Sequence, residues 1–225
     1  PAEEAMDIAK QVLLAMLMLI LLSVLIPARA EEAVSPMIVS ETADSTEYPA
    51  LESDIPVITS EGKSNVKIAG VKSKNKLVRY TIPETLLRAD ENFLALMVEA
   101  EKYIGYPYVY GGSKPSTGFD CSGFVCWVFR QSGIYDTGRL GAKGLYSLCT
   151  DVSRDEARPG DLVFFTKTMG ADVKGITHVG IYVGNDMMLH AGDPVGFADL
   201  QSDKWAKKIY AFGRLPVQQG AQANE

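Results

Sequence analysis

Three side chains in this sequence could together perform nucleophilic catalysis: the thiol of Cys121 and the imidazoles of His178 and His190. A free thiol is only a few per cent thiolate at pH 7, so it needs a base or a lowered pKa. An imidazole within hydrogen-bond reach supplies both, and a third polar group then orients its ring. The chain has only two histidines, and His178 as the base with His190 as the orienting group fits the strand geometry described below.

The position of Cys121 favours a reactive thiol. Asp120 is a good helix N-cap, and the residues after it are compatible with a helix as far as Gly133. Cys121 would then lie in the first turn, where free N–H groups and the positive end of the helix dipole favour thiolate. The backbone N–H of Cys121 could also stabilise an oxyanion. Residues 124–129 are apolar on all sides, so we expect this helix to be central and buried.

Short apolar runs at residues 162–165, 176–183, 187–191 and 207–212 predict strands. Before them, an apolar pattern over residues 89–104 predicts a helix whose buried face carries Phe93, Leu94, Met97, Val98, Ala100, Tyr103 and Ile104. Residues 136–156 show no clear pattern. A helix followed by several antiparallel strands is typical of the α+β class.

The predicted hairpin between the second and third strands brings the histidines together. A three-residue loop, Gly184-Asn185-Asp186, pairs Val183 with Met187 and Gly180 with His190. His178 then lies diagonal to His190 on one face, with Cβ atoms roughly 7–8 Å apart. The opposite face would carry aliphatic side chains, and a two-residue loop would move His190 to that face.

Composition limits the classes of function. A chain of 225 residues, 47% of them hydrophobic, can form one sizeable core, and the net charge of −6 gives no reason to expect nucleic-acid binding. Three cysteines without a CxxC pair argue against a disulfide framework and a structural zinc site. We interpret Cys126 and Cys149 as packing residues. A zinc site formed by Cys121 and both histidines is an alternative, but it lacks a close-spaced ligand pair. We therefore predict no metal and no cofactor.

Residues 1–30 resemble a targeting segment. Residues 12–26 are apolar except for Ser23, and Ala28-Arg29-Ala30 fits a signal-peptidase site. The alternative is an uncleaved anchor that attaches the chain to the membrane through residues 12–26. Either interpretation places the remaining chain outside the cytoplasmic membrane.

Residues 31–82 are predicted to be an extended, polar and disordered linker. Residues 31–62 carry eight acidic residues and no Lys or Arg, whereas residues 63–79 carry only basic charges. The basic part could simply be solvated, or it could be a tether that touches anionic wall polymer or lipid headgroups. Residues 66–71 and 77–82 could form a weak hairpin. The folded catalytic domain is expected over residues 83–217, followed by a tail over 218–225.

Five sequence blocks resemble the NlpC/P60 family of cell-wall cysteine peptidases, and they follow that family's order and usual spacing. They are Pro107-Tyr108-x-Tyr110-Gly111-Gly112, Phe119-Asp120-Cys121-Ser122-Gly123-Phe124-Val125, Arg158–Phe165, His178–Gly184 and His190-Ala191. The resemblance covers roughly residues 90–215. It implies a papain-like α+β fold in which a central helix, carrying the nucleophile, packs on an antiparallel sheet.

The resemblance also implies roles for particular residues. Cys121 would be the nucleophile, His178 the base and His190 the polar third residue. Tyr108 matches a tyrosine beside the nucleophile, while Asp120 and Ser122 match residues that shape the substrate side. Tyr106 and Tyr110 are expected to pack.

The implied substrate is the peptidoglycan stem peptide, cut between D-γ-glutamate and a diamino acid through a thioester. Residues 137–150 match only loosely, so no substrate residue is assigned there. An amidase or acyl transferase on the same scaffold, and an inactive wall-binding module, are the alternatives.

Overall fold

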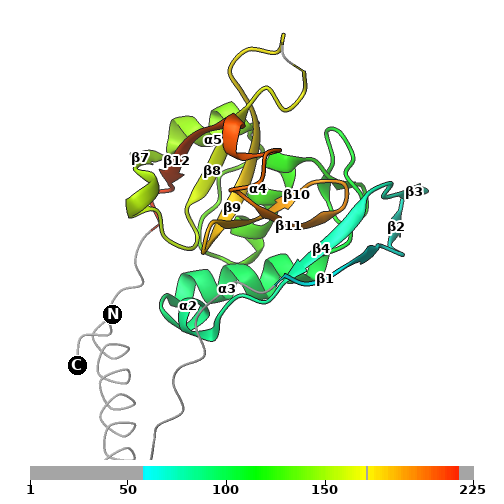
Figure 1. The fold of residues 1–225 in the computed structure, drawn as a ribbon, viewed down its shortest axis with the longest axis horizontal. Helices are drawn as coiled ribbons and strands as arrows, with labels where there is room; N and C mark the ends of the chain where they lie inside the picture. Colours follow the sequence, from blue (N-terminus) through cyan, green and yellow to red (C-terminus); the bar gives the residue numbers. More distant parts are fainter. Residues whose placement is uncertain (1–57, 171, 218–225) are drawn as a thin grey trace, which may run out of the picture. The chain divides into compact units, whose positions relative to one another are not determined.

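The computed structural model describes residues 58–170 and 172–217 (Figure 1). The predicted signal peptide or anchor, residues 31–57 of the predicted linker, and the predicted tail lie outside these residues. Within the described part of the chain, no helix combines the length and the apolar character needed to cross a membrane.

A six-stranded antiparallel sheet forms the centre of the fold. Its strands are β7 (Thr150–Val152), β8 (Leu162–Thr166), β9 (Ile176–Gly184), β10 (Met187–Ala191), β11 (Val195–Asp199) and β12 (Ile209–Arg214). Their spatial order is β11-β10-β9-β8-β12-β7. The strands expected at 162–165, 176–183 and 187–191 are confirmed, and the one expected at 207–212 begins two residues later. β7 and β11 were not predicted.

The helices are α2 (Glu84–Arg88), α3 (Glu91–Ala100), α4 (Cys121–Gln131) and α5 (Ala142–Leu148), together with the 3₁₀ turns η1 (Glu101–Tyr103), η2 (Arg154–Glu156) and η3 (Ala206–Lys208). The helix expected at 89–104 is α3 followed by η1, because Asp90 caps α3 by accepting from the N–H groups of Asn92 and Phe93. Its expected buried face was wrong at two positions. Leu94 and Val98 are 40% and 59% exposed, whereas Leu96 is buried.

The two faces of the sheet have different environments. One face packs against α3, α4 and α5 in the main core, which contains Leu96, Phe124, Val128, Leu145, Phe164, Val179, Ile181 and Leu189. The other face carries a smaller cluster formed by Val163, Phe165, Met188, Leu200, Trp205 and Phe212. The chain between β11 and β12 supplies Leu200 and Trp205 to this cluster. This arrangement is the predicted α+β architecture, with α4 central and buried on the sheet.

The prediction of an extended linker over residues 31–82 was wrong for residues 58–82. These residues form β1 (Ile58–Lys63), β2 (Lys67–Ile68), β3 (Val71–Lys72) and β4 (Lys76–Tyr80). β1 pairs with β4, and β2 pairs with β3. The weak hairpin expected between 66–71 and 77–82 therefore has different partners. The folded unit begins well before Pro83.

Residues 58–82 are folded because several of their apolar side chains are buried against β11. Leu77, Tyr80 and Ile82 are only 5–6% exposed, and the ring of Tyr80 meets Phe197 of β11 edge to face at 5.5 Å. β4 lies so close to β11 that a Cβ atom at Gly196 would come within 2.9 Å of the Leu77 side chain. Burying these apolar groups offsets the cost of ordering a highly charged segment. In Figure 1 the segment lies alongside β11.

Candidate active site

The first turn of α4 holds Cys121 in a fixed network. The Asp120 carboxylate accepts from the Gly123 N–H at 2.6 Å and from the Ser122 hydroxyl at 3.1 Å, which confirms the predicted N-cap. It also accepts from the Gly111 N–H at 3.1 Å. Gly123 allows this approach, because a Cβ atom there would lie 2.1 Å from the Gly112 carbonyl oxygen. The loop over 111–113, which includes part of β5 (Ser113–Lys114), therefore clamps the helix start.

The histidine hairpin has the predicted faces but a different loop. Met188 pairs with Tyr182 as expected, whereas Met187 pairs with Gly184 rather than Val183, and a β-bulge lies between these two pairs. Asn185 and Asp186 form a two-residue turn, both with positive φ. The bulge adds one residue to β9 and so compensates for the shorter loop. His190 therefore stays on the face of Gly180, where a Cβ atom would meet the Cβ of His190 at 3.2 Å.

The two histidine rings are in direct contact. His178 Nε2 lies 2.9 Å from His190 Nδ1. Trp205 covers them both: its ring stacks on His178 at 5.2 Å and meets His190 edge to face at 5.0 Å. The sequence did not indicate Trp205, because it lies in an irregular segment more than ten residues after His190. The pair is thus an oriented, largely dry imidazole dyad.

The thiol of Cys121 lies beside β9. Backbone N–H groups of Val179, Ser122 and Cys121 act on it and favour the thiolate, and Val179 directly follows His178. Burial, followed by the negative charge of Asp120, has the opposite and larger effect and raises the pKa of Cys121 to about 11. The prediction that the helix start favours thiolate was therefore wrong in its net sign. The capping carboxylate and the loss of hydration outweigh the helix end.

The histidines are neutral for related reasons. Burial, and then the positive charge of Lys204, lower the pKa of His178 to about 3. Burial also lowers the pKa of His190, with additional contributions from His178 and Lys204. These pKa shifts favour a thiol and neutral imidazoles over a thiolate–imidazolium pair before a substrate binds.

Tyr108 and Arg139 complete the region around the thiol. Burial, and then the neighbouring Cys121 and Asp120, raise the pKa of the Tyr108 hydroxyl to about 12, so this tyrosine lies near Cys121. Arg139 was not predicted. Its Nη2 donates to Asp120 at 2.6 Å and its Nη1 donates to the Ser122 hydroxyl at 3.0 Å. Only the charge of Asp120 hinted at such a partner, and no spacing rule points to residue 139.

A cleft of about 400 Å³ opens beside the imidazole dyad. Its walls include Tyr108, Tyr110, Met169, His178, His190, Asp193, Lys204, Trp205 and Lys208. Tyr110 is 78% exposed at this cleft, so its expected packing role was wrong, whereas Tyr106 packs against Tyr103 as expected. The cleft brings His178 and His190 together with the cationic side chains of Lys204 and Lys208.

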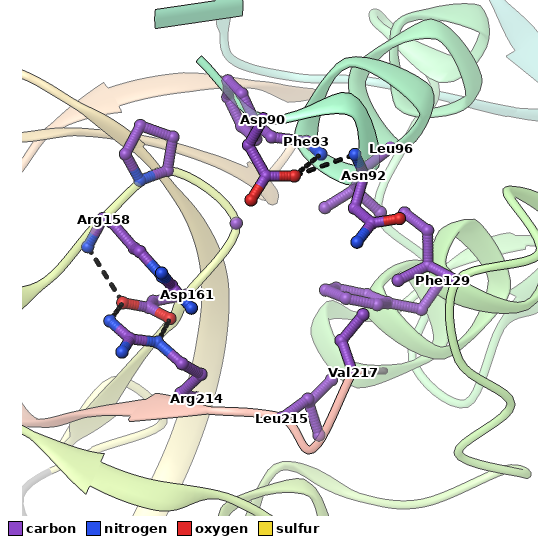
Figure 2. Close-up of a pocket in the computed structure, with 13 residues that line it drawn as sticks. Asp90, Asn92, Phe93, Leu96, Phe129, Arg158, Asp161, Arg214, Leu215 and Val217 are labelled. Atoms are coloured by element: carbon purple, nitrogen blue, oxygen red, sulfur yellow. Dashed lines mark hydrogen bonds and ion pairs between the residues drawn. The ribbon is translucent and has the colours of Figure 1, made fainter. Parts of the chain in front are cut away.

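A second pocket, of about 290 Å³, lies between α3, the end of α4 and the loop before β8 (Figure 2). None of the predicted site residues lines it. Asp161, only 3% exposed, is held there by Arg214 through two bonds of 2.7 and 2.8 Å. It also accepts from the Arg158 N–H at 2.9 Å, so this carboxylate ties the turn that precedes β8 to Arg214 at the end of β12. Within the described ranges, no group of three or more His, Cys, Asp or Glu side chains could hold a metal ion.

Comparison with known proteins gives consistent matches. The family model described as "NlpC/P60 family" matches residues 105–214. The bifunctional muramidase/DL-endopeptidase CwlT of Bacillus subtilis is 46% identical over 121 residues, which is 53% of this chain and 36% of the relative. The gamma-DL-glutamyl hydrolase of the same species is 42% identical over 120 residues, covering 52% of this chain and 28% of the relative.

Among solved structures, a lipoprotein-like protein of the NLP/P60 family from Staphylococcus aureus matches with a TM-score of 0.53 and 41% identity. The match covers 56% of this chain and 42% of that protein. The chain spans about a third or less of the length of the curated relatives reported above. The similarity therefore concerns the domain that contains the cysteine and the histidines.

Proposed function

The chain belongs to the NlpC/P60 family, and on that premise we propose that it is a peptidoglycan hydrolase that cleaves wall stem peptides as a cysteine endopeptidase. The observation that carries the proposal is the placement of the Cys121 thiol against the backbone of Val179, next to the His178–His190 pair. The names of the relatives, a DL-endopeptidase and a gamma-DL-glutamyl hydrolase, support the bond between D-γ-glutamate and a diamino acid as the scissile bond.

In the proposed reaction, Cys121 Sγ attacks the γ-carbonyl carbon of D-glutamate while His178 Nδ1 accepts the thiol proton. His178 Nε2 is engaged with His190, so Nδ1 is the ring nitrogen left for this transfer. The backbone N–H groups near the sulfur, including that of Cys121, stabilise the tetrahedral oxyanion. When the carbon–nitrogen bond breaks, His178 returns the proton to the leaving amine of the diamino acid.

The resulting γ-glutamyl thioester is hydrolysed by the reverse proton path. His178 accepts a proton from water, the hydroxyl adds to the thioester carbon, and the Cys121 sulfur leaves and regains the proton. Tyr108, Asp120 and Ser122 form the substrate side of the thiol. Arg139 holds Asp120 and Ser122 in place. The cationic side chains Lys204 and Lys208 line the cleft and would attract stem-peptide carboxylates.

We further propose that the enzyme acts outside the cytoplasmic membrane. The support is the apolar run over residues 12–26 and the Ala28-Arg29-Ala30 site after it. This segment would be a signal peptide or an anchor that attaches the chain to the membrane. Its substrate partner would be peptidoglycan, with no role for nucleic acid.

The deciding experiment is digestion of defined soluble muropeptides, with the products identified by mass. We expect one new amino terminus on the diamino acid and one γ-glutamyl carboxyl group. Cys121→Ala should abolish the product, whereas Cys149→Ala, at a half-buried thiol outside the site, should leave the rate unchanged. Release of an intact stem peptide would instead indicate an amidase, and capture of the acyl group by an added amine would indicate an acyl transferase. An unchanged rate in Cys121→Ala would reject the enzyme assignment.

A further inference from the structure

The β1–β4 segment of the folded unit carries exposed basic side chains that the proposed reaction does not explain. Together they are called here the basic hairpin surface: Lys63, Lys67, Lys72, Lys74, Lys76 and Arg79. All of these residues are exposed, and no acidic residue occurs between positions 63 and 79. The chain as a whole has a net charge of −6. The segment is therefore positively charged, whereas the chain as a whole is negatively charged.

The strand pairing brings like charges face to face. Lys67 is directly opposite Lys72 across β2 and β3, and Lys63 is directly opposite Lys76 across β1 and β4. Directly opposed like charges destabilise a sheet. Among the described residues of this surface, the ion pair present is Lys76 with Glu61, at 3.4 Å and with both side chains at least half exposed. Such a pair contributes little. A bound polyanion would remove the repulsion.

The β1–β4 segment contacts a residue that lines the cleft. The backbone N–H of Lys74 donates to the Asp193 carboxylate at 3.1 Å, and Asp193 lines the cleft together with Lys204 and Lys208. Burial of Leu77 and Tyr80 against β11 holds the whole segment in place. A polymer lying on the hairpins would thus pass close to the cleft entrance.

We propose that the basic hairpin surface binds the phosphodiester-linked anionic polymer of the bacterial wall and holds that wall against the cleft. Ammonium groups are compact point charges that can meet repeated phosphates without a fixed geometry. A lipid surface fits less well, because membrane-surface segments combine cations with an apolar face. Here the exposed large hydrophobic residue of the segment is Val71 alone, among the described side chains. A single-stranded nucleic acid also fits less well, since residues 63–79 contain no aromatic side chain for base stacking.

The test measures binding of the full chain to purified wall sacculi, in a Cys121→Ala background so that the walls stay intact. One variant neutralises an opposed pair, Lys67→Gln/Lys72→Gln. The matched control, Lys114→Gln/Lys143→Gln, neutralises two exposed lysines elsewhere. We expect the first variant to weaken binding about threefold to tenfold, the control to bind as the parent does, and the difference to shrink as salt increases.

The source of the phosphate is tested with sacculi stripped of phosphodiester-linked polymer by hydrofluoric acid. The parent should bind stripped walls as weakly as the Lys67→Gln/Lys72→Gln variant binds intact ones. Equal binding to stripped and intact walls, or equal binding by variant and parent, would overturn the proposal. So would tighter binding to anionic lipid vesicles or to DNA than to intact walls.

A separate measurement keeps this proposal distinct from the proposed function. With Cys121 present, the Lys67→Gln/Lys72→Gln variant should cleave soluble muropeptides at the parent rate and melt at or slightly above the parent temperature, because it removes an opposed pair of like charges. Failure of soluble cleavage in the parent would reject the hydrolase and leave the wall-binding result standing. Loss of soluble cleavage in the variant alone would contradict a role limited to the polymer.

Discussion

His178 Nε2 and His190 Nδ1 lie 2.9 Å apart, with both rings buried beneath Trp205. At this distance the two rings form a hydrogen bond, in which one ring nitrogen is the donor and the other is the acceptor. When His178 donates from Nε2, its Nδ1 has no proton and is free to act as a base. In the proposed reaction, His190 would thereby select the reactive tautomer of His178, so the two histidines would have different roles.

The first prediction separates these two roles. His178→Ala should lower kcat/KM on a soluble muropeptide by about a thousandfold or more, because no other described group beside the thiol can take its proton. His190→Gln should cost only about tenfold to a hundredfold, since an amide can still accept from His178 Nε2. Thermal melts should confirm that both variants fold. Equal losses in the two variants would contradict the assignment.

The second prediction concerns the pH dependence of the thiol. Because the pKa of Cys121 is raised to about 11, the thiol form dominates at neutral pH. The rate of alkylation by iodoacetamide should therefore rise about tenfold per pH unit between pH 7 and pH 10. The measurement needs a Cys149→Ser background, which removes the half-buried thiol that would compete for the reagent. A rate already at its plateau below pH 8 would instead show a resting thiolate–imidazolium pair.

The third prediction concerns Arg139. Arg139→Gln removes the charged partner of the Asp120 carboxylate, whose side chain is only 11% exposed. The free energy of unfolding should fall by about 1–2 kcal/mol, with the value limited by the partial exposure of Arg139. Alkylation of Cys121 should also slow, because the uncompensated Asp120 charge disfavours the thiolate further. Chemical denaturation and alkylation kinetics measure the two effects.

A suitable control for Arg139 is Arg88→Gln, which breaks the Arg88–Glu84 pair on an exposed helix surface, with side chains 76% and 72% exposed. Its effect on unfolding should be below about 0.5 kcal/mol, and alkylation should not change. If Arg139→Gln changes the free energy of unfolding and the alkylation rate as little as Arg88→Gln does, the Asp120–Arg139 pair does not stabilise the region around Cys121.

The fourth prediction concerns the segment before Pro83. Leu77→Ala removes a side chain that is 5% exposed in the contact with β11 and should lower the free energy of unfolding by about 2–3 kcal/mol. Val71→Ala, at a position that is 40% exposed in the same segment, should change it by less than about 0.5 kcal/mol. Chemical denaturation of the full chain compares the two. If both variants lower the free energy of unfolding by the same small amount, residues 58–82 are a linker and not part of the fold.

The histidine hairpin illustrates how far sequence reasoning reached. Alternation along residues 176–191 correctly placed His178 and His190 on one face and the aliphatic residues on the other. The loop was wrong, because a bulge depends on how the chain closes the turn rather than on alternation. His190 still lies on the expected face, because the extra residue in the bulge has the same effect on strand alternation as the expected third loop residue.

The ordered segment before Pro83 shows where the same reasoning failed. As a set, Leu77, Tyr80 and Ile82 follow neither a period of two nor one of 3.6, and they come directly after a run rich in lysine. Their burial depends on β11, a strand that was itself not predicted. Arg139 was missed for a similar reason, since it reaches Asp120 from an irregular segment. A contact made from a segment without a recognisable pattern cannot be predicted from the sequence of that segment.

Trp205 gives the site its own optical signal. The chain has two tryptophans, and the other, Trp127, donates to the Tyr103 hydroxyl at 2.8 Å, away from the imidazole pair. A chain carrying Trp127→Phe would therefore have a single indole, stacked on His178 and lining the cleft. Its emission would follow both protonation of the neighbouring rings and entry of a peptide. The covering that keeps the histidines dry also makes their state visible without a label.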